Sequence, residues 1–246
     1  MENQFDPRMT GGQAASVGVP RAARDVGLRS YMLSVYNYMA SGVLLTAIVA
    51  LLFAPYAQAV LISQSGRGLS GLGWIVTLAP LGFVFALSLG ANRMSVGTMK
   101  LVFFAFAATM GLSMSTLFIA YTGVSIAQTF AAVTASFLGL SLYGYTTKKD
   151  LSGFGTFLIM GVVGLLVAMV INMFLQSSAM QLAISAIGVL LFAGLTAYDT
   201  QKIKSMYAYV QGSDMVAKSA VMGALTLYLD FINMFQFMLS FMGSRR

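Results

Sequence analysis

Residues 225–235, LTLYLDFINMF, place Asp230 in the middle of a long apolar run. Residues 194–204, GLTAYDTQKIK, place Asp199 near the end of the preceding apolar run. The other five acidic residues precede the first run or lie in polar gaps: Glu2, Asp6, Asp25, Asp150 and Asp214. A carboxylate in hydrocarbon costs roughly 2.5–3.5 kcal/mol on insertion scales. Asp199 and Asp230 are therefore the candidate functional residues.

The composition indicates an integral membrane protein. Of 246 residues, 58% are hydrophobic and only 9% are charged, whereas soluble domains carry about 25% charged residues. The chain has no cysteine and no histidine, which excludes disulfides, thiolate metal sites and the usual catalytic triads. We expect no cofactor. The net charge of +7 fits membrane orientation better than nucleic-acid binding, so no nucleic acid is expected as a partner.

Seven apolar stretches are long enough to cross a membrane, which takes about 20 residues. They are residues 33–54, 72–91, 101–121, 126–146, 155–175, 180–201 and 217–241. Pro55 is predicted to end the first. We therefore predict an all-α fold, in which residues 31–246 form one bundle of seven transmembrane helices. Residues 1–30 contain four arginines and no apolar run, so they predict a disordered, basic cytosolic arm.

The basic residues predict the orientation. With the N-terminus in the cytosol, eleven of the 14 lysines and arginines fall on the cytosolic side, as the positive-inside rule requires. The C-terminus then lies outside if the last run crosses the membrane. If that run is re-entrant, the C-terminus returns to the cytosol, and charge counting leaves both possibilities open.

Polar residues on the last run predict its position in the bundle. Thr226, Asp230 and Asn233 fall on one helical face, and a polar face in lipid must turn toward protein or water. The last helix is therefore expected to be central, with the other six around it. A purely structural, hydrogen-bonded Asp230 is the alternative. For Asp199 the alternative is an interfacial acid neutralised by Lys202.

The two aspartates can meet only if the last helix begins well inside the cytosol. Asp230 is 12 residues beyond Lys218, or about 18 Å along a helix. Two carboxylates in a dry site cannot both ionise at low cost, so such a pair would share a proton. Its change of charge can bias a closed against an open packing, and its oxygens suit transient calcium binding. Arg93 is the candidate gating counter-charge, or else a positive-inside anchor.

Small residues predict where helices approach closely. Two rows with the required spacing are Gly82, Ala86 and Gly90, and Ala131, Ala135 and Gly139.

Four segments, SLGANRMS (88–95), YGYTTKKDLSGFG (143–155), AYDTQ (197–201) and LDFIN (229–233), resemble the Bax inhibitor-1 family, also called the transmembrane Bax inhibitor motif family. The resemblance implies a seven-helix bundle with the last helix in the middle, and a pH-dependent calcium leak. It implies that Asp199 and Asp230 form a proton-sharing pair, and that Arg93 latches onto Asp199 in the closed form. Some members carry an acid within the second helix; residues 72–91 have none, so no ion path through such an acid is expected.

The resemblance is to bacterial members, which implies the inner membrane, with lipid, protons and calcium as partners. Bacterial relatives are also tied to a membrane-bound AAA protease, so a modulator of such a protein, without transport, is the alternative function. An intramembrane aspartyl protease would need a YD and a GxGD motif. Residues 197–201 supply the first, but LYLD at 227–230 does not supply the second, so we expect no enzyme.

Overall fold

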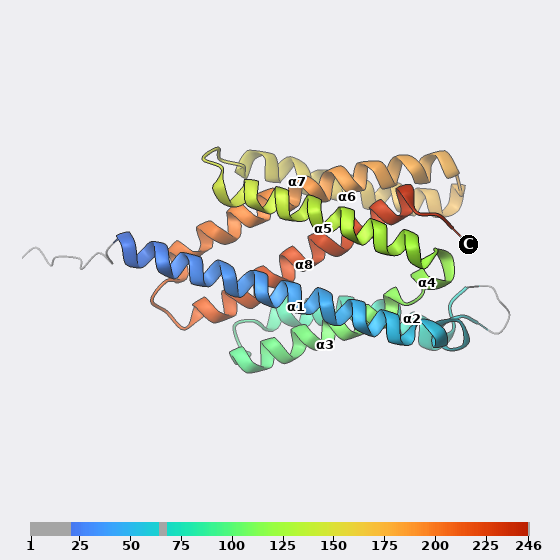
Figure 1. Cartoon of the computed structure of the whole chain (residues 1–246), viewed down its shortest axis with the longest axis horizontal. Helices are drawn as coiled ribbons and strands as arrows, with labels where there is room; N and C mark the ends of the chain where they lie inside the picture. The colour runs from blue at the N-terminus through green and yellow to red at the C-terminus, as the bar shows by residue number, and fades with distance from the viewer. Residues whose placement is uncertain (1–20, 64–67, 246) are drawn as a thin grey trace, which may run out of the picture.

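A computed structural model describes residues 21–63 and 68–245 (Figure 1). Its helices are α1 (Arg21–Leu61), α2 (Gly71–Gly90), α3 (Val96–Met114), α4 (Leu117–Ala120), α5 (Gly123–Thr146), α6 (Ser152–Leu175), α7 (Ser178–Val210) and α8 (Met215–Met242). Because α3 and the short α4 form one crossing, the described residues contain seven helices long and apolar enough to span a membrane. The predicted all-α, seven-span fold class is confirmed.

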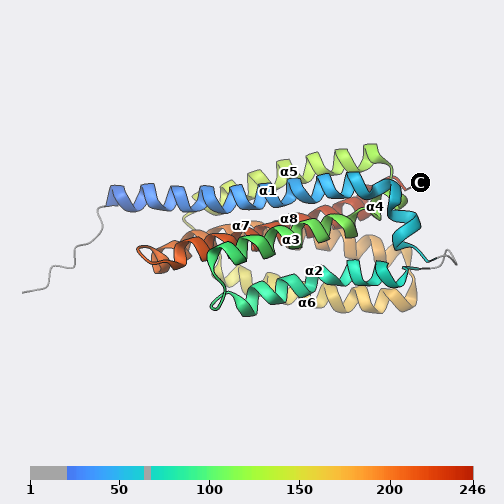
Figure 2. The same ribbon diagram turned by 90° about the horizontal axis from the view of Figure 1, so that it is seen from below.

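The first helix is longer at both ends than its apolar run. α1 begins at Arg21, so residues 21–30 of the expected arm are helical, while residues 1–20 lie outside the described part of the chain. Pro55 was predicted to end this helix, but it lies inside it, so that prediction is wrong. α1 bends near its C-terminal end (Figure 2), and the missing N–H of a proline is a common cause of such a bend.

α8 has the largest buried share of the seven spans. It packs mainly against α7, α1, α5 and α3, and Figure 1 shows it running between α1 and α5. α2 packs against α3 and α1, while α6 packs against α7. The contacts of α8 with α7, α1, α5 and α3 explain its burial. The predicted arrangement of all six other spans around α8 stays a prediction.

The close helix contacts use other glycines than the predicted rows. Gly82 and Gly139 face open space. A Cβ on Gly144 of α5 would instead meet the backbone carbonyl of Ala197 in α7, and one on Gly111 of α3 would meet that of Thr46 in α1. The spacing of small residues shows where a backbone could approach, but only the partner helix decides which face is used.

The two ends of the bundle differ in charge. The α2–α3, α5–α6 and α7–α8 connections lie at the end where α1 begins (Figure 1). Most of the described basic residues lie in these connections or in the parts of the helices toward that end. α8 is one unbroken helix of 28 residues, and the chain beyond it reaches the α4–α5 connection, where the Thr122 N–H donates to the Ser244 carbonyl at 3.2 Å. The last run is therefore not re-entrant. Which end faces the cytosol stays a prediction.

Candidate functional site

The α7–α8 hairpin carries both candidate aspartates. α7 continues to Val210, beyond the end of its apolar run at residue 201, and α8 begins at Met215. Asp199 thus lies about 16 Å from the end of α7, and Asp230 about 22 Å from the start of α8. Because the helices are antiparallel neighbours, these depths bring the two residues alongside each other.

The two carboxyl groups lie within hydrogen-bonding reach of one another. Asp199 is 9% exposed and Asp230 is 4% exposed. Among the described residues, Asp230 Oδ2 is the only buried side-chain nitrogen or oxygen atom without a hydrogen-bond partner when both aspartates are taken as carboxylates. A carboxyl that keeps its proton can donate to its neighbour, whereas two carboxylates have no donor between them. The geometry therefore suits a pair holding at least one proton.

Positive charge reaches this pair only at a distance. Lys202 acts electrostatically on Asp199, but its Nζ lies over the ring of Tyr198, 5.8 Å from the centroid. Lys204 donates instead to the Tyr145 carbonyl at 2.7 Å. No acid–base ion pair within 4 Å occurs among the described side chains, residues 25–63 and 68–245. The direct neighbour of Asp199 is therefore an acid and not a lysine.

Arg93 lies apart from the pair. It is exposed in the turn between α2 and α3, where its backbone N–H donates to the Gly90 carbonyl at 2.9 Å. A latch between Arg93 and Asp199 would need this turn to move, so its gating role stays a prediction.

The predicted polar stripe on α8 does not act as one group. Thr226 donates to the Met222 carbonyl at 3.2 Å, and Asn233 donates to the Leu229 carbonyl at 2.8 Å. Both side chains are half-buried and are satisfied by their own helix. Asp230 is the member of the stripe whose partner lies on another helix.

A chain of hydroxyl groups that was not predicted from the sequence reaches the neighbourhood of the pair. The Tyr36 hydroxyl of α1 is 2.7 Å from Ser141 Oγ of α5, which is 3.0 Å from Thr200 Oγ1 of α7. Thr200 is fully buried and follows Asp199 directly. Serine and threonine often bond to their own helix in a membrane span, so nothing in the local sequence distinguishes these residues.

The site offers few side chains that could hold a resident metal ion. No group of three or more histidine, cysteine, aspartate or glutamate side chains that could hold a metal occurs in the described part of the chain, and calcium takes six to eight oxygen ligands. Two carboxylates can contact a passing cation, so the calcium contact predicted for Asp199 and Asp230 stays a transient one and a prediction.

The fold and the buried pair define the class: a seven-helix integral membrane protein with an acidic pair between its last two helices. The chain belongs to the Bax inhibitor-1 family, because the family model described as "Inhibitor of apoptosis-promoting Bax1" matches residues 28–246. This confirms the resemblance found in the sequence.

Bacterial relatives cover nearly the whole chain. An uncharacterized protein of Rickettsia prowazekii is 46% identical over 224 residues, 90% of this chain and 92% of the relative. The inner membrane protein YbhL of Escherichia coli K12 is 43% identical over 233 residues, covering 94% and 97%. An uncharacterized protein of Caulobacter vibrioides is 41% identical over 244 residues, covering 96% and 97%.

Proposed function

We propose that this protein is a proton-controlled cation leak of the bacterial inner membrane, with calcium as its cation. The observation that carries the proposal is the buried contact between Asp199 and Asp230. No other pair of acidic side chains among the described residues shares a buried site. The inner membrane is supported by the name of the Escherichia coli relative.

The proton acts through the packing of α7 against α8. While the pair shares a proton, a hydrogen bond joins the two helices. When the proton leaves, two negative charges face each other; at about 4 Å and an effective dielectric constant near 20 they repel by roughly 4 kcal/mol. A term of that size shifts a two-state equilibrium by roughly a thousandfold. Protonation can therefore select between two packings of the hairpin.

The separated carboxylates would form a weak cation site. Carboxylate oxygens in a low-dielectric bundle attract a hard divalent cation. Because two side chains fill only part of a calcium shell, the ion is held loosely and can leave again, which conduction requires. In the packed state the pair is almost fully covered, so ion access depends on the same rearrangement that follows deprotonation.

The test is calcium flux into dye-filled vesicles containing the purified protein, measured across a pH titration. Asp230→Asn keeps the shape of the side chain and can still hydrogen-bond to Asp199, but removes one titratable group. We expect this variant to lose the pH dependence of the flux. Asp214→Asn, an exposed acid in the turn before α8, is the matched control and should behave as the wild type.

Two results would end the proposal. One is a pH-dependent flux that Asp230→Asn leaves unchanged. The other is a wild-type protein that passes no calcium at any pH; this outcome would favour the alternative, a modulator of another membrane protein such as an AAA protease.

A further inference from the structure

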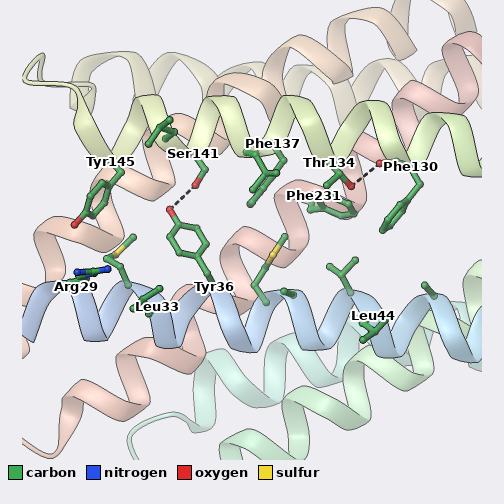
Figure 3. A pocket seen from close by; sticks show the side chains of 17 residues that line it. Arg29, Leu33, Tyr36, Leu44, Phe130, Thr134, Phe137, Ser141, Tyr145 and Phe231 are labelled. Carbon is green, nitrogen blue, oxygen red and sulfur yellow. Dashed lines mark hydrogen bonds between the residues drawn. The ribbon is translucent and has the colours of Figure 1, made fainter.

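A groove with a volume of about 670 Å³ lies between α1 and α5 (Figure 3). Leu33 and Leu44 are on its α1 wall, Thr134 and Leu138 are on its α5 wall, and Phe231 of α8 lies at its floor. α1 and α5 are not among the helix pairs that pack closely. Almost all of the lining is apolar. The groove is therefore a hollow in the side of the bundle where the backbones of α1 and α5 stay apart, and the Tyr36–Ser141 hydrogen bond is a side-chain contact between them.

The groove is longer than a membrane leaflet is deep. Its lining extends along α1 from Arg29 to Ala47, or about 27 Å, whereas one leaflet contributes about 15 Å of hydrocarbon. A second hollow of about 280 Å³ shares Val43, Ala47, Phe130 and Phe231 with it and continues it toward α4. An extended acyl chain fits this length.

One end of the groove is polar and basic. Arg29 and Tyr145 lie close together at that end, with the Tyr36 and Ser141 hydroxyls deeper along the groove (Figure 3). No acidic side chain of the described residues lies within 4 Å of Arg29. Lys204, whose Nζ lies 4.9 Å from the centre of the Tyr145 ring, adds a second positive charge nearby. A guanidinium of this kind is well suited to a phosphate.

We propose that this groove binds one anionic glycerophospholipid, with its phosphate at Arg29 and an acyl chain along α1 and α5. The apolar length needs a thin hydrocarbon occupant, and the basic end needs a negative head. The bilayer around the spans supplies both in one molecule.

The test is native mass spectrometry of the delipidated full-length protein, with phosphatidylglycerol or phosphatidylethanolamine of identical acyl chains added. We expect one bound phosphatidylglycerol and a preference of about fivefold over phosphatidylethanolamine, the effect of about one basic residue near an anionic surface. Arg29→Gln should remove the preference and keep the binding of both lipids, because the apolar groove is unchanged.

Filling the groove should remove lipid of both kinds. Ala40→Trp on α1 and Leu138→Trp on α5 each place an indole in the hollow, and either variant suffices if the other fails to fold. Ala135→Trp, at an exposed position of α5 outside the groove, is the matched control and should bind as the wild type. Equal binding of the two lipids by the wild type would overturn the proposal. Lipid binding that survives in a folded groove-filling variant would also overturn it. So would a wild-type protein that forms a dimer and binds no lipid.

Discussion

At the scale of single residues, the described core depends on buried polar groups with specific partners. Thr46 donates to the Ala107 carbonyl at 2.8 Å, so the Tyr228 hydroxyl, 2.6 Å from Thr46 Oγ1, is the donor in their contact. The Tyr228 ring meets Phe106 and Phe103 edge to face, with centroids 5.0 and 6.1 Å apart. Tyr228 is fully buried and thereby links α8 to α1 and α3.

Two substitutions at Tyr228 separate its hydroxyl from its ring. Tyr228→Phe removes one hydrogen bond but leaves Thr46 paired with Ala107, so we expect a loss of about 1 kcal/mol in the free energy of unfolding. Tyr228→Ala also empties the space of the ring and should cost about 3–5 kcal/mol. Denaturant titration in detergent measures both. Tyr209→Ala, at a tyrosine that is 87% exposed, should cost far less; an equal loss there would contradict this role for Tyr228.

At the scale of the helices, backbone contacts decide which faces meet. α5 approaches α7 so closely at Gly144 that a Cβ there would overlap the Ala197 carbonyl oxygen. The same helix has a second glycine, Gly139, with no atom within 4 Å of its hypothetical Cβ. The α5–α7 contact also brings Ser141 to Thr200, and thus contributes to the surroundings of Asp199.

Gly144 and Gly139 form a matched pair of positions on α5. Gly144→Ala must push α5 away from α7, because the obstructing atoms belong to the backbone, so we expect a loss of about 1–3 kcal/mol in stability. Gly139→Ala should leave stability unchanged or raise it by up to about 1 kcal/mol, since alanine favours the helix. Thermal unfolding in one detergent compares them. Equal midpoints would show that α5 and α7 are not in this contact.

The contact between the two aspartates also depends on the helices, because it requires α7 and α8 to extend beyond their apolar runs. The apolar runs end at residue 201 and begin again at residue 217, but the helices extend to Val210 and start at Met215. Residues 202–210 contain two lysines among their polar side chains, so hydropathy does not assign them to a span. Their helical structure depends on packing against neighbours, which apolar counting does not detect.

At the scale of the whole molecule, charge is distributed unevenly between the two ends. Basic side chains gather at the end that holds the α2–α3, α5–α6 and α7–α8 connections, and Arg245 is at the opposite end. The mouth of the lipid groove, marked by Arg29, is at the basic end. If that end is cytosolic, as the positive-inside rule predicts, the proposed lipid comes from the cytosolic leaflet.

The absence of native cysteine allows a direct test of orientation. Ser213→Cys lies in the α7–α8 turn and Ser178→Cys lies at the start of α7, and both native side chains are exposed. With a membrane-impermeant maleimide, we expect Ser178→Cys to react from outside and Ser213→Cys to react only after the cytosolic side is opened. The reverse pattern would overturn the predicted orientation, and labelling of both from outside would contradict a single crossing by α7.

The sequence alone determined how many times this chain can cross a membrane and which acids need an explanation. Backbone polar groups in hydrocarbon must bond within their own helix, so each long apolar run already specifies a spanning helix. Asp199 and Asp230 stand out because charge in such a run is costly.

Only the tertiary structure decided what these residues contact: the meeting of the two carboxyl groups, the use of Gly144 instead of Gly139, and the groove between α1 and α5. The physical reason is that hydropathy and helix formation depend on neighbours along the chain. The partner of a helical face depends on residues more than a hundred positions away, as for Tyr36 and Ser141.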